Sequence, residues 1–406
     1  MKKVSIIGLC LLTAAAATAQ KTVVKEAEKA MKSGQPFTEV VKIITPAYSN
    51  AETEKSAEAY YIPGKAGFKQ YDDVLGKKQV GIIKADDPKV AEAANALLGG
   101  YEYFMKALPL DSLPDEKGKV KTKYSKDILS TIQGHQSDFN LAAVDFWSAK
   151  EYDKAYKSWG IFLDFKGNAL FPKAQQYPDT VLADIAFNQA LAAWQASQFD
   201  NALTSFRNAV KLGYDKKPLY EYAIAVATNA KNNEALIEFA QAGNEKFGHE
   251  DSQFVNHIIN YYLQTEKYAE ACAFLDKAIA ADPNNAQYYA LEGIIFDNQK
   301  DRAKAMECYQ KSIDLDANNS IGLFYMGRAN AAQAGEMSDN YNGNNYDNYK
   351  ATEIDPLYRK AAELLEKAYN LDENNRSQIL QVLEICYYNL NDSEGLKTVE
   401  QRKLED

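Results

Sequence analysis

The sequence has little of the chemistry from which most active sites and metal sites are built. Its 406 residues include only three histidines, at positions 135, 249 and 257. Their spacing does not match a helical metal-binding pair, and no Cys-x-x-Cys accompanies them. A glycine-rich phosphate loop after a strand and a G-x-S-x-G nucleophile motif are also missing. We therefore expect no catalytic residue, no metal and no cofactor, and predict that the protein is not an enzyme.

Cysteine is scarce as well. Of the four cysteines, Cys10 lies in an apolar leader, where Leu9 precedes it in place of the small residue that a lipid-anchored leader needs. We therefore expect no lipid anchor. The other three, Cys272, Cys308 and Cys386, are an odd number and cannot form a complete disulfide framework. They are interpreted as small apolar residues in or near the core, and whether any two of them pair stays open.

A basic surface is missing too. The formal net charge is −10, and the loss of Lys2 and Lys3 with a cleaved leader would take it to −12. An acidic protein without a large basic patch repels phosphate backbones. Nucleic acid is therefore excluded as an expected partner.

The first residues have the pattern of a secretory signal peptide. Lys2 and Lys3 precede the apolar run Val4–Leu12, and small residues end in Ala17-Thr18-Ala19. We predict a signal peptide over residues 1–19, cleaved after Ala19, and export to the periplasm or the outer membrane. No later segment approaches about 20 consecutive apolar residues, so no transmembrane segment is expected after signal removal.

Two consecutive blocks between Ser252 and Asn319 superpose with a shift of 34 residues. Ala271 falls on Ala305, and Leu275 falls on Tyr309. The same kind of small residue opens a predicted second helix along much of the chain, at Ala155, Ala202, Ala235, Ala271, Ala305, Ala361 and Gly395. A small residue lets two helices approach closely, and a large one four positions later returns on the same face to fill the core.

The intervals between these small residues are 47, 33, 36, 34, 56 and 34. The two long intervals locate two insertions. The first falls between Phe165 and Asp179, after a second helix, and the other is residues 334–355, between the two helices of one repeat. In the amino-terminal part we predict a helix over Phe37–Ile44, a helix over Ala57–Tyr71 interrupted at Pro63-Gly64, a loop over Gly76–Asp87 and a helix beginning at Pro88.

The 34-residue period with these small and aromatic positions resembles the tetratricopeptide repeat (TPR). The resemblance implies an all-α fold, a right-handed superhelical solenoid of antiparallel helix pairs with about eight repeats. It covers residues 121–406 well, ending in a capping helix over Asn391–Asp406. Residues 20–120 match it only loosely, and the polar break Leu110–Lys123 separates this divergent section from the array.

In TPR proteins the first helices of the pairs line a concave groove that accepts a segment of a partner protein. The register carried onto this chain places the following residues in that groove: Asn140, Val144, Trp147, Phe187, Trp194, Tyr220, Asn256, Asn260, Asp297 and Arg328. Stacked asparagines suit a peptide backbone, an arginine suits a carboxylate, and exposed tryptophans suit apolar anchors. The lysines of the carboxyl-terminal peptide clamp known in some TPR co-chaperones do not occur at the corresponding places.

The second insertion is rich in Asn, Asp and Tyr. Tyr341, Tyr346 and Tyr349 suit an exposed recognition loop, against the simpler interpretation of a solvated loop. A calcium-binding EF-hand fails here, because Tyr349 takes the place of the bidentate glutamate.

Together these features predict a non-catalytic interaction scaffold of the cell envelope. It resembles secreted TPR proteins of Gram-negative bacteria and would bind a partner protein segment on its concave surface. The alternative is a glycan- or nutrient-binding envelope protein on a TPR frame, similar to the starch-binding outer-membrane receptors. Those are lipoproteins with long ligand loops, whereas this chain has one substantial internal insertion and no lipid anchor motif.

Overall fold

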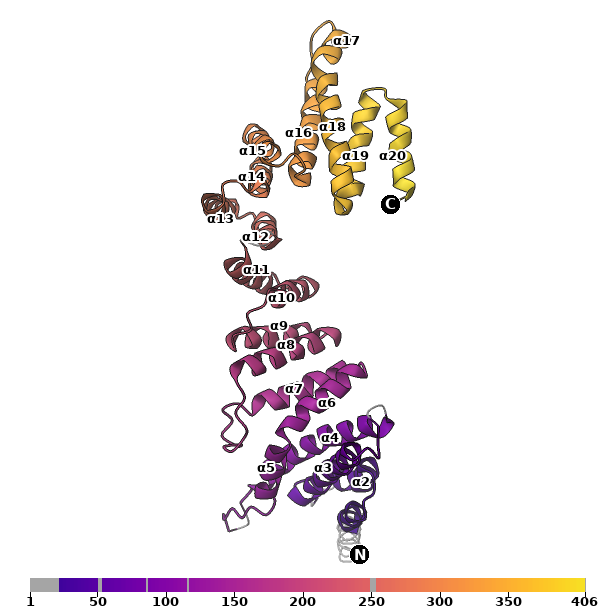
Figure 1. Ribbon diagram of the computed structural model, residues 1–406, viewed down its shortest axis with the longest axis vertical. Helices are drawn as coiled ribbons and strands as arrows, with labels where there is room; N and C mark the ends of the chain where they lie inside the picture. Colours follow the sequence, from indigo (N-terminus) through magenta and orange to yellow (C-terminus); the bar gives the residue numbers. More distant parts are fainter. Residues whose placement is uncertain (1–21, 50–52, 85–86, 115–116, 249–252, 406) are drawn as a thin grey trace, which may run out of the picture. The chain divides into compact units, whose positions relative to one another are not determined.

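The predicted fold class is confirmed: the chain is an all-α solenoid of antiparallel helix pairs (Figure 1). The computed structural model describes residues 22–49, 53–84, 87–114, 117–248 and 253–405. Within these ranges all regular structure is helical, apart from an isolated antiparallel bridge between Pro114 and Val120. The predicted signal peptide, residues 1–19, lies outside the described residues.

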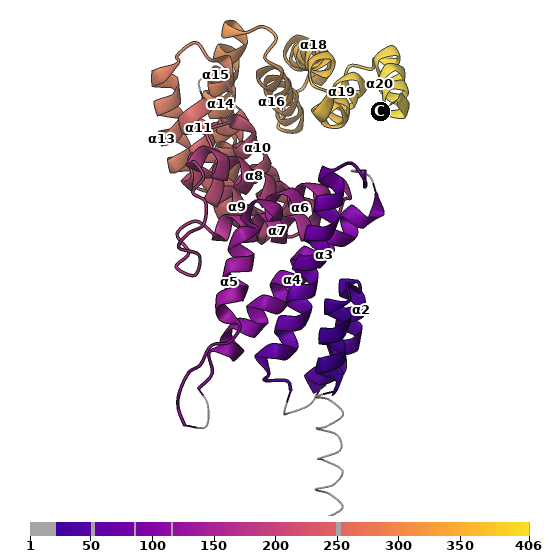
Figure 2. The same ribbon diagram turned by 60° about the horizontal axis from the view of Figure 1, so that its bottom comes forward.

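The chain forms two compact units, which we call unit 1 (up to Asn232) and unit 2 (from Asn233). Unit 1 contains a helix over residues 22–32, α2 (Phe37–Ile44), the 3₁₀ turn η1 (Thr45–Ser49), α3 (Ala57–Gln79), α4 (Pro88–Asp111), α5 (Ser125–Gly134), α6 (Gln136–Ser148), α7 (Tyr152–Asp164), α8 (Asp179–Gln195), α9 (Phe199–Lys211) and α10 (Lys217–Asn229). Figures 1 and 2 show α3 and α4 side by side.

Unit 2 contains α11 (Asn233–Phe247), α12 (Gln253–Gln264), α13 (Tyr268–Ala281), α14 (Ala286–Asn298), α15 (Arg302–Leu315), α16 (Ser320–Asp339), α17 (Tyr346–Tyr349), the π-helical turn η2 (Lys350–Ile354), α18 (Asp355–Leu371), the 3₁₀ turn η3 (Glu373–Asn375), α19 (Arg376–Asn389) and α20 (Ser393–Glu405). The predicted boundary near residue 120 falls inside unit 1, where α4 packs against α6. The division between a divergent amino-terminal section and the regular repeat array stays a prediction from the sequence.

The small residues that set the repeat register lie at close helix contacts. The alanines are all fully buried: Ala155, Ala202, Ala235, Ala271, Ala305 and Ala361. Large side chains four positions later, such as Trp159, Leu275 and Tyr309, are also buried. Each second helix therefore presents one small and one large side chain to its first helix, as the sequence pattern predicts.

A recurrent turn joins the two helices of a pair. Six non-glycine residues adopt positive φ angles of 54–64°, and each lies between a first and a second helix: Lys150, Ser197, Lys231, Glu266, Lys300 and Asn391. The next residue donates its backbone N–H back to the helix, as from Glu151 to the Phe146 carbonyl at 2.8 Å and from Lys267 to the Tyr262 carbonyl at 2.8 Å. This left-handed helix cap satisfies carbonyls that the helix end would leave unpaired.

The predicted interruption at Pro63-Gly64 is wrong, because α3 runs unbroken through Pro63. Proline has no N–H to donate to the carbonyl four residues earlier, that of Ala59. The Tyr48 hydroxyl donates to that carbonyl instead, at 3.1 Å. Gly64 does serve as a close-contact glycine, since an added Cβ would lie 2.2 Å from the Phe104 ring.

The loop predicted over Gly76–Asp87 begins later, because α3 continues to Gln79. The helix predicted from Pro88 is confirmed, and the Asp87 side chain caps it by accepting from the Lys89 N–H at 2.9 Å. The polar break after α4 is held by Asp111, whose buried carboxylate accepts the backbone N–H groups of Lys123, Tyr124 and Ser125.

Two segments of the structure correspond to the predicted insertions. The first is the irregular segment between α7 and α8. The second is not a long loop, because α16 extends to Asp339, and α17 and η2 lead directly into α18. Only residues 340–345 lie between helices. Tyr341, Tyr346 and Tyr349 are therefore placed at the end of a lengthened helix pair.

Replacing Gly293 by alanine should destabilise unit 2, because the added Cβ would lie 2.4 Å from the buried Tyr309 ring. We expect a loss of about 1–3 kcal/mol, typical of overpacking. Gly335, also inside a helix, has its nearest neighbour 3.6 Å away. Gly335→Ala should therefore gain about 0.5–1 kcal/mol from helix propensity. Urea unfolding followed by circular dichroism measures both, and equal shifts would contradict the close contact at Gly293.

Candidate functional site

The first helices of unit 1, α6, α8 and α10, leave one face open to solvent. Lys150, Ser197 and Lys231 each follow the end of one of these helices. Residues that lie the same number of positions before them are therefore equivalent on the three helices. Leu141, Asn188 and Tyr222 share one position, and all three are exposed: Leu141 by 50% and Tyr222 by 40%. Val144, Leu191 and Ala225, three residues further on, are exposed or half-buried. We call these six residues the open stripe.

Aromatic side chains support the α10 end of the open stripe. Tyr222 lies 5.7 Å from Trp194 and 6.1 Å from Phe187, both on α8. Phe187 in turn stacks on Tyr214 at 4.6 Å. The predicted groove residues Phe187 and Trp194 are thus brought together here, half-buried, and they hold the Tyr222 ring in a defined position.

A small pocket of about 100 Å³ adjoins the α6 end, between α3, α4 and α6. Leu141 and Val144 form its outer wall, and Tyr71 and Asp145 also line it. Burial raises the pKa of the Asp145 carboxyl, and Lys78 only partly opposes this shift. Burial similarly raises the pKa of Asp138, about two turns earlier on the same helix. A partly desolvated carboxylate beside an apolar wall favours a cationic or apolar side chain.

Two predicted groove residues on α6 are occupied within their own helix pair. The Asn140 side-chain oxygen accepts the indole N–H of the buried Trp159 at 2.9 Å. Trp147 packs edge-on to Tyr152, with ring centroids 5.1 Å apart, and lies 6.2 Å from Trp159. These contacts give both residues a role in joining α6 to α7.

The assignment of Tyr220 to the groove is wrong. Tyr220 is fully buried on α10, as is its neighbour Leu219. The exposed aromatic residue of this helix is Tyr222, two positions later. The sequence does not distinguish the two tyrosines, because Tyr220 and Tyr222 fit the aromatic pattern of the repeat equally well. The position of the Lys231 turn, which the structure supplies, is needed to choose between them.

Three of the four predicted groove residues of unit 2 already have side-chain partners within the unit. Arg328 donates to Asp297 at 2.7 Å and lies over the Tyr325 ring at 4.5 Å. The Asn256 side-chain oxygen accepts from Gln287 at 2.7 Å. Asn260 is exposed. An incoming carboxylate would therefore compete with Asp297 for Arg328.

The three tyrosines of the second insertion contact each other. Tyr341 stacks on Tyr349 with centroids 4.6 Å apart, and its hydroxyl accepts the Asn345 N–H at 2.9 Å. Tyr346 lies 5.6 Å from Tyr341 and is 38% exposed. Most of the aromatic surface predicted for recognition is thus used within the cluster.

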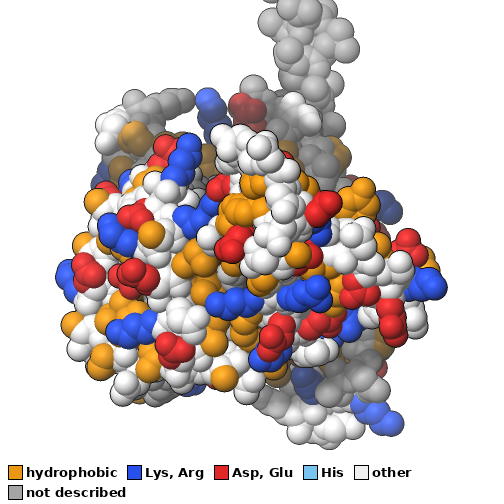
Figure 3. Space-filling view, turned by 90° about the horizontal axis from the view of Figure 1, so that it is seen from above, with side chains coloured by type: hydrophobic (Ala, Val, Ile, Leu, Met, Phe, Trp, Pro, Cys, Tyr) orange, Lys and Arg blue, Asp and Glu red, His pale blue; other side chains and the backbone are white. Residues whose placement is uncertain are grey.

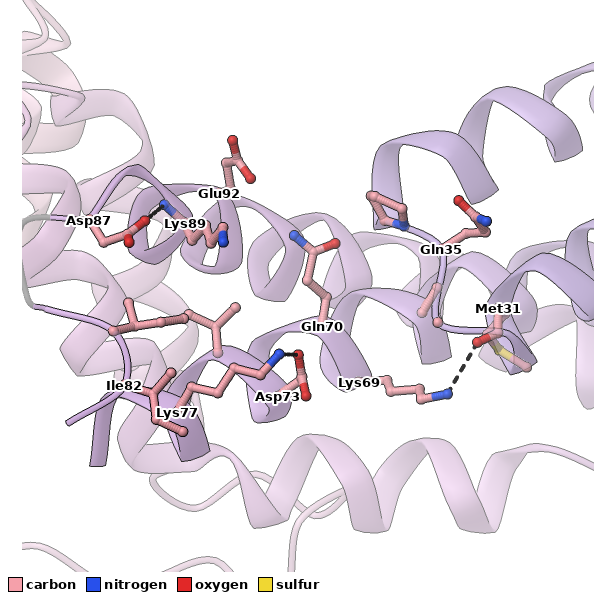
Figure 4. A pocket seen from close by; sticks show the side chains of 15 residues that line it. Met31, Gln35, Lys69, Gln70, Asp73, Lys77, Ile82, Asp87, Lys89 and Glu92 are labelled. Atoms are coloured by element: carbon pink, nitrogen blue, oxygen red, sulfur yellow. Dashed lines mark hydrogen bonds and ion pairs between the residues drawn. The ribbon is translucent and has the colours of Figure 1, made fainter. Parts of the chain in front are cut away.

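A large cavity of unit 1 lies elsewhere, between the segment after the 22–32 helix, α3 and the start of α4 (Figure 4). It has a volume of about 790 Å³ and is lined by both apolar and charged side chains. None of its lining residues is among the predicted site residues, because the lining comes from three separate segments. The apolar residues between α3 and α4 are the sequence feature that could have indicated this cavity.

Potential nucleophiles are poorly disposed for chemistry. Burial, with Glu292 nearby, raises the pKa of the Cys308 thiol to about 12, and burial alone raises that of Cys386 to about 12. Such thiols carry little thiolate at neutral pH. Among the described residues, no three His, Cys, Asp or Glu side chains lie where they could jointly hold a metal ion.

The face of the protein shown in Figure 3 is mixed in charge. Hydrophobic, basic and acidic side chains alternate on the face shown in Figure 3, without a large area of one sign. No helix among the described residues combines the length and apolar character needed to cross a bilayer.

Comparison with known proteins identifies the repeats. The family model described as tetratricopeptide repeat matches residues 260–285 and 286–319. No curated protein matches the chain. Similar solved structures include YrrB, a TPR protein described as having an unusual peptide-binding site (15% identity, 50% of this chain and 96% of that one, TM-score 0.32).

Two further solved structures are similar to the chain. One is the C-terminal part of a TPR repeat-containing protein from Cytophaga hutchinsonii (17% identity, 64% of this chain and 92% of that one, TM-score 0.38). The other is a TPR repeats protein from Bacteroides fragilis (19% identity, 62% and 98%, TM-score 0.33). At these scores the likenesses carry no argument about function.

The structural role of Asn140 is testable. Asn140→Ala leaves the buried Trp159 indole N–H without its acceptor, and we expect a loss of about 1–3 kcal/mol of unfolding free energy. The matched control is Asn188→Ala, which removes an exposed side chain from α8 and should be neutral or slightly stabilising. Urea unfolding monitored by tryptophan fluorescence compares them. Equal stability of the two variants would return Asn140 to the candidate groove residues.

Proposed function

We propose that this protein, whose chain carries tetratricopeptide repeats, is an interaction scaffold that binds a segment of a partner protein along the open stripe of unit 1. The observation that carries the proposal is the exposure of Leu141 and Tyr222 at one repeat position of two first helices, with Asn188 between them. An exposed leucine and an exposed tyrosine on rigid helices supply the apolar anchors that dominate binding free energy.

The chemistry of the open stripe suits a polypeptide better than a compact ligand. Its groups recur from helix to helix, so an extended segment would meet an aliphatic, an amide and an aromatic side chain in turn. The Asn188 amide can donate to and accept from a peptide backbone. Beside Leu141, the pocket of about 100 Å³ has room for a single side chain, and the Asp145 carboxylate in its lining favours a basic one.

Site-specific photo-crosslinking tests the proposal. A photoreactive amino acid in place of Leu141 or of Tyr222 should form crosslinks to the same partner protein in cells, and mass spectrometry should map both to one segment. The matched control is Leu170, which is 47% exposed in the irregular segment between α7 and α8 and lies outside the open stripe. It should give no such product.

A second variant separates binding from folding. Leu141→Asp places a charge on a half-exposed position, so the unfolding free energy should change by less than about 0.5 kcal/mol. Crosslinking from position 222 should nevertheless fall about ten-fold or more, because an apolar anchor of the same segment is lost. Crosslinking from 222 that is insensitive to Leu141→Asp would show that the open stripe is not one binding surface.

We also propose that the scaffold works in the cell envelope, on the strength of the leader pattern in residues 1–19. In a Gram-negative host the full chain should be recovered from the envelope fraction with Gln20 as its first residue, as shown by peptide mapping. Replacing Leu11 and Leu12 by arginine should interrupt the apolar run and leave an uncleaved chain in the cytoplasm. An uncleaved wild-type chain in the cytoplasm would contradict envelope export.

A further inference from the structure

The cavity in Figure 4 combines hydrogen-bond donors with an apolar wall inside unit 1. Its volume of about 790 Å³ lies within the range of small-molecule sites. It is lined by residues of other helices than the open stripe, so it needs an explanation of its own.

Most charged groups around the cavity already have partners. Lys77 pairs with Asp73 at 2.6 Å. Asp87 is committed to the cap of α4 through the Lys89 backbone N–H. Lys69 donates to the Met31 carbonyl at 3.2 Å, at the end of the 22–32 helix. These contacts fix the frame of the cavity and engage Asp73 and Asp87. Glu92 also lines the cavity, and in Figure 4 its carboxylate points away from the space between Lys89 and Gln70.

Two donor groups remain. The Gln70 side-chain oxygen accepts the Phe37 N–H at 2.7 Å, which fixes the amide and leaves its NH₂ group free to donate. The Lys89 ammonium group has no ion-pair or hydrogen-bond partner among the described residues. Figure 4 shows the Lys89 and Gln70 head groups pointing toward one another across the cavity. An acceptor placed between them would receive one neutral and one charged hydrogen bond.

The remaining wall is aliphatic. Val74 and Ile83 are buried and form part of the lining. Ile82 also lines the cavity, although 72% of it is exposed to solvent. An exposed isoleucine over a buried aliphatic floor gains free energy when an apolar group covers it.

We propose that this cavity binds a small aliphatic carboxylate, with the carboxylate between Lys89 and Gln70 and the hydrocarbon part against Ile82 and Val74. A charged ammonium and a fixed amide NH₂ together match the two oxygens of one carboxylate. The same chemistry occurs in a free short-chain acid and in the last residue of a peptide. The two sources differ in how much chain must leave the cavity.

Isothermal titration calorimetry of the full chain with hexanoate tests the inference. Hexanoate should bind saturably with one site, and hexanamide, which lacks the charge, should bind about ten-fold more weakly or worse. N-acetyl-leucine and an acetylated tetrapeptide ending in leucine form the second arm. Tighter binding of the tetrapeptide assigns the site to peptide carboxyl ends, and tighter binding of hexanoate assigns it to free acids. Absence of saturable heat with all three carboxylates at millimolar concentration would overturn the proposal.

Matched variants locate the site. Gln70→Glu keeps the acceptor for the Phe37 N–H but replaces the donor by an anion, and Lys89→Met removes the charge; each should weaken hexanoate binding about ten-fold or more. Lys84→Met, an exposed lysine outside the lining, should not.

Ile82→Asn should weaken binding, whereas Val80→Asn, at 70% exposure outside the lining, should leave it unchanged. Equal effects of the variants and their controls would place the ligand elsewhere, whether or not the open stripe binds a partner.

Discussion

The close approach of two helices at a buried alanine is the constraint on which the rest of the structure depends. Ala155, Ala271 and Ala305 are fully buried, and each is followed four residues later by a large buried side chain. A larger residue at the alanine position would separate the helices and expose the core side chain beside it. Each helix of a pair covers only one side of its partner. The stability of the chain therefore also depends on the contacts between neighbouring pairs. The first helices of unit 1 consequently keep one face free.

The sequence predicts this arrangement because side-chain size repeats visibly, but it does not show how the pairs are closed. Four of the six turn residues with positive φ are Lys or Glu, which are not typical turn residues. A left-handed conformation costs such a residue about 1–2 kcal/mol. The backbone hydrogen bond that follows each turn, and the packing of the pair, offset that cost. The assignment of Tyr220 instead of Tyr222 to the exposed face follows from this missing signal.

Other differences between the predicted and the observed structure are explained by contacts between elements. Pro63 predicts an interruption, but the Tyr48 hydroxyl occupies the carbonyl that Pro63 cannot satisfy. The Asn-rich insertion predicts a loop, yet α16 and α18 extend along it and Tyr341 stacks on Tyr349. In both cases local composition is overruled by a tertiary contact that supplies the missing hydrogen bond or apolar cover. Such contacts cannot be read from neighbouring residues alone.

Several side chains that are suited to recognition are already used in contacts within the fold. Asn140, Asn256 and Arg328 have the side chains that a groove needs, but each holds another residue of its own unit. A ligand would have to break those bonds before it gained new ones, and a buried donor left unpaired is costly. Leu141 and Tyr222 on the open stripe, and Lys89 beside the cavity, bear no such commitment. The first two offer a shallow apolar surface to a polypeptide, whereas Lys89 lines a cavity with a fixed amide donor, and this difference in chemistry assigns them different ligands.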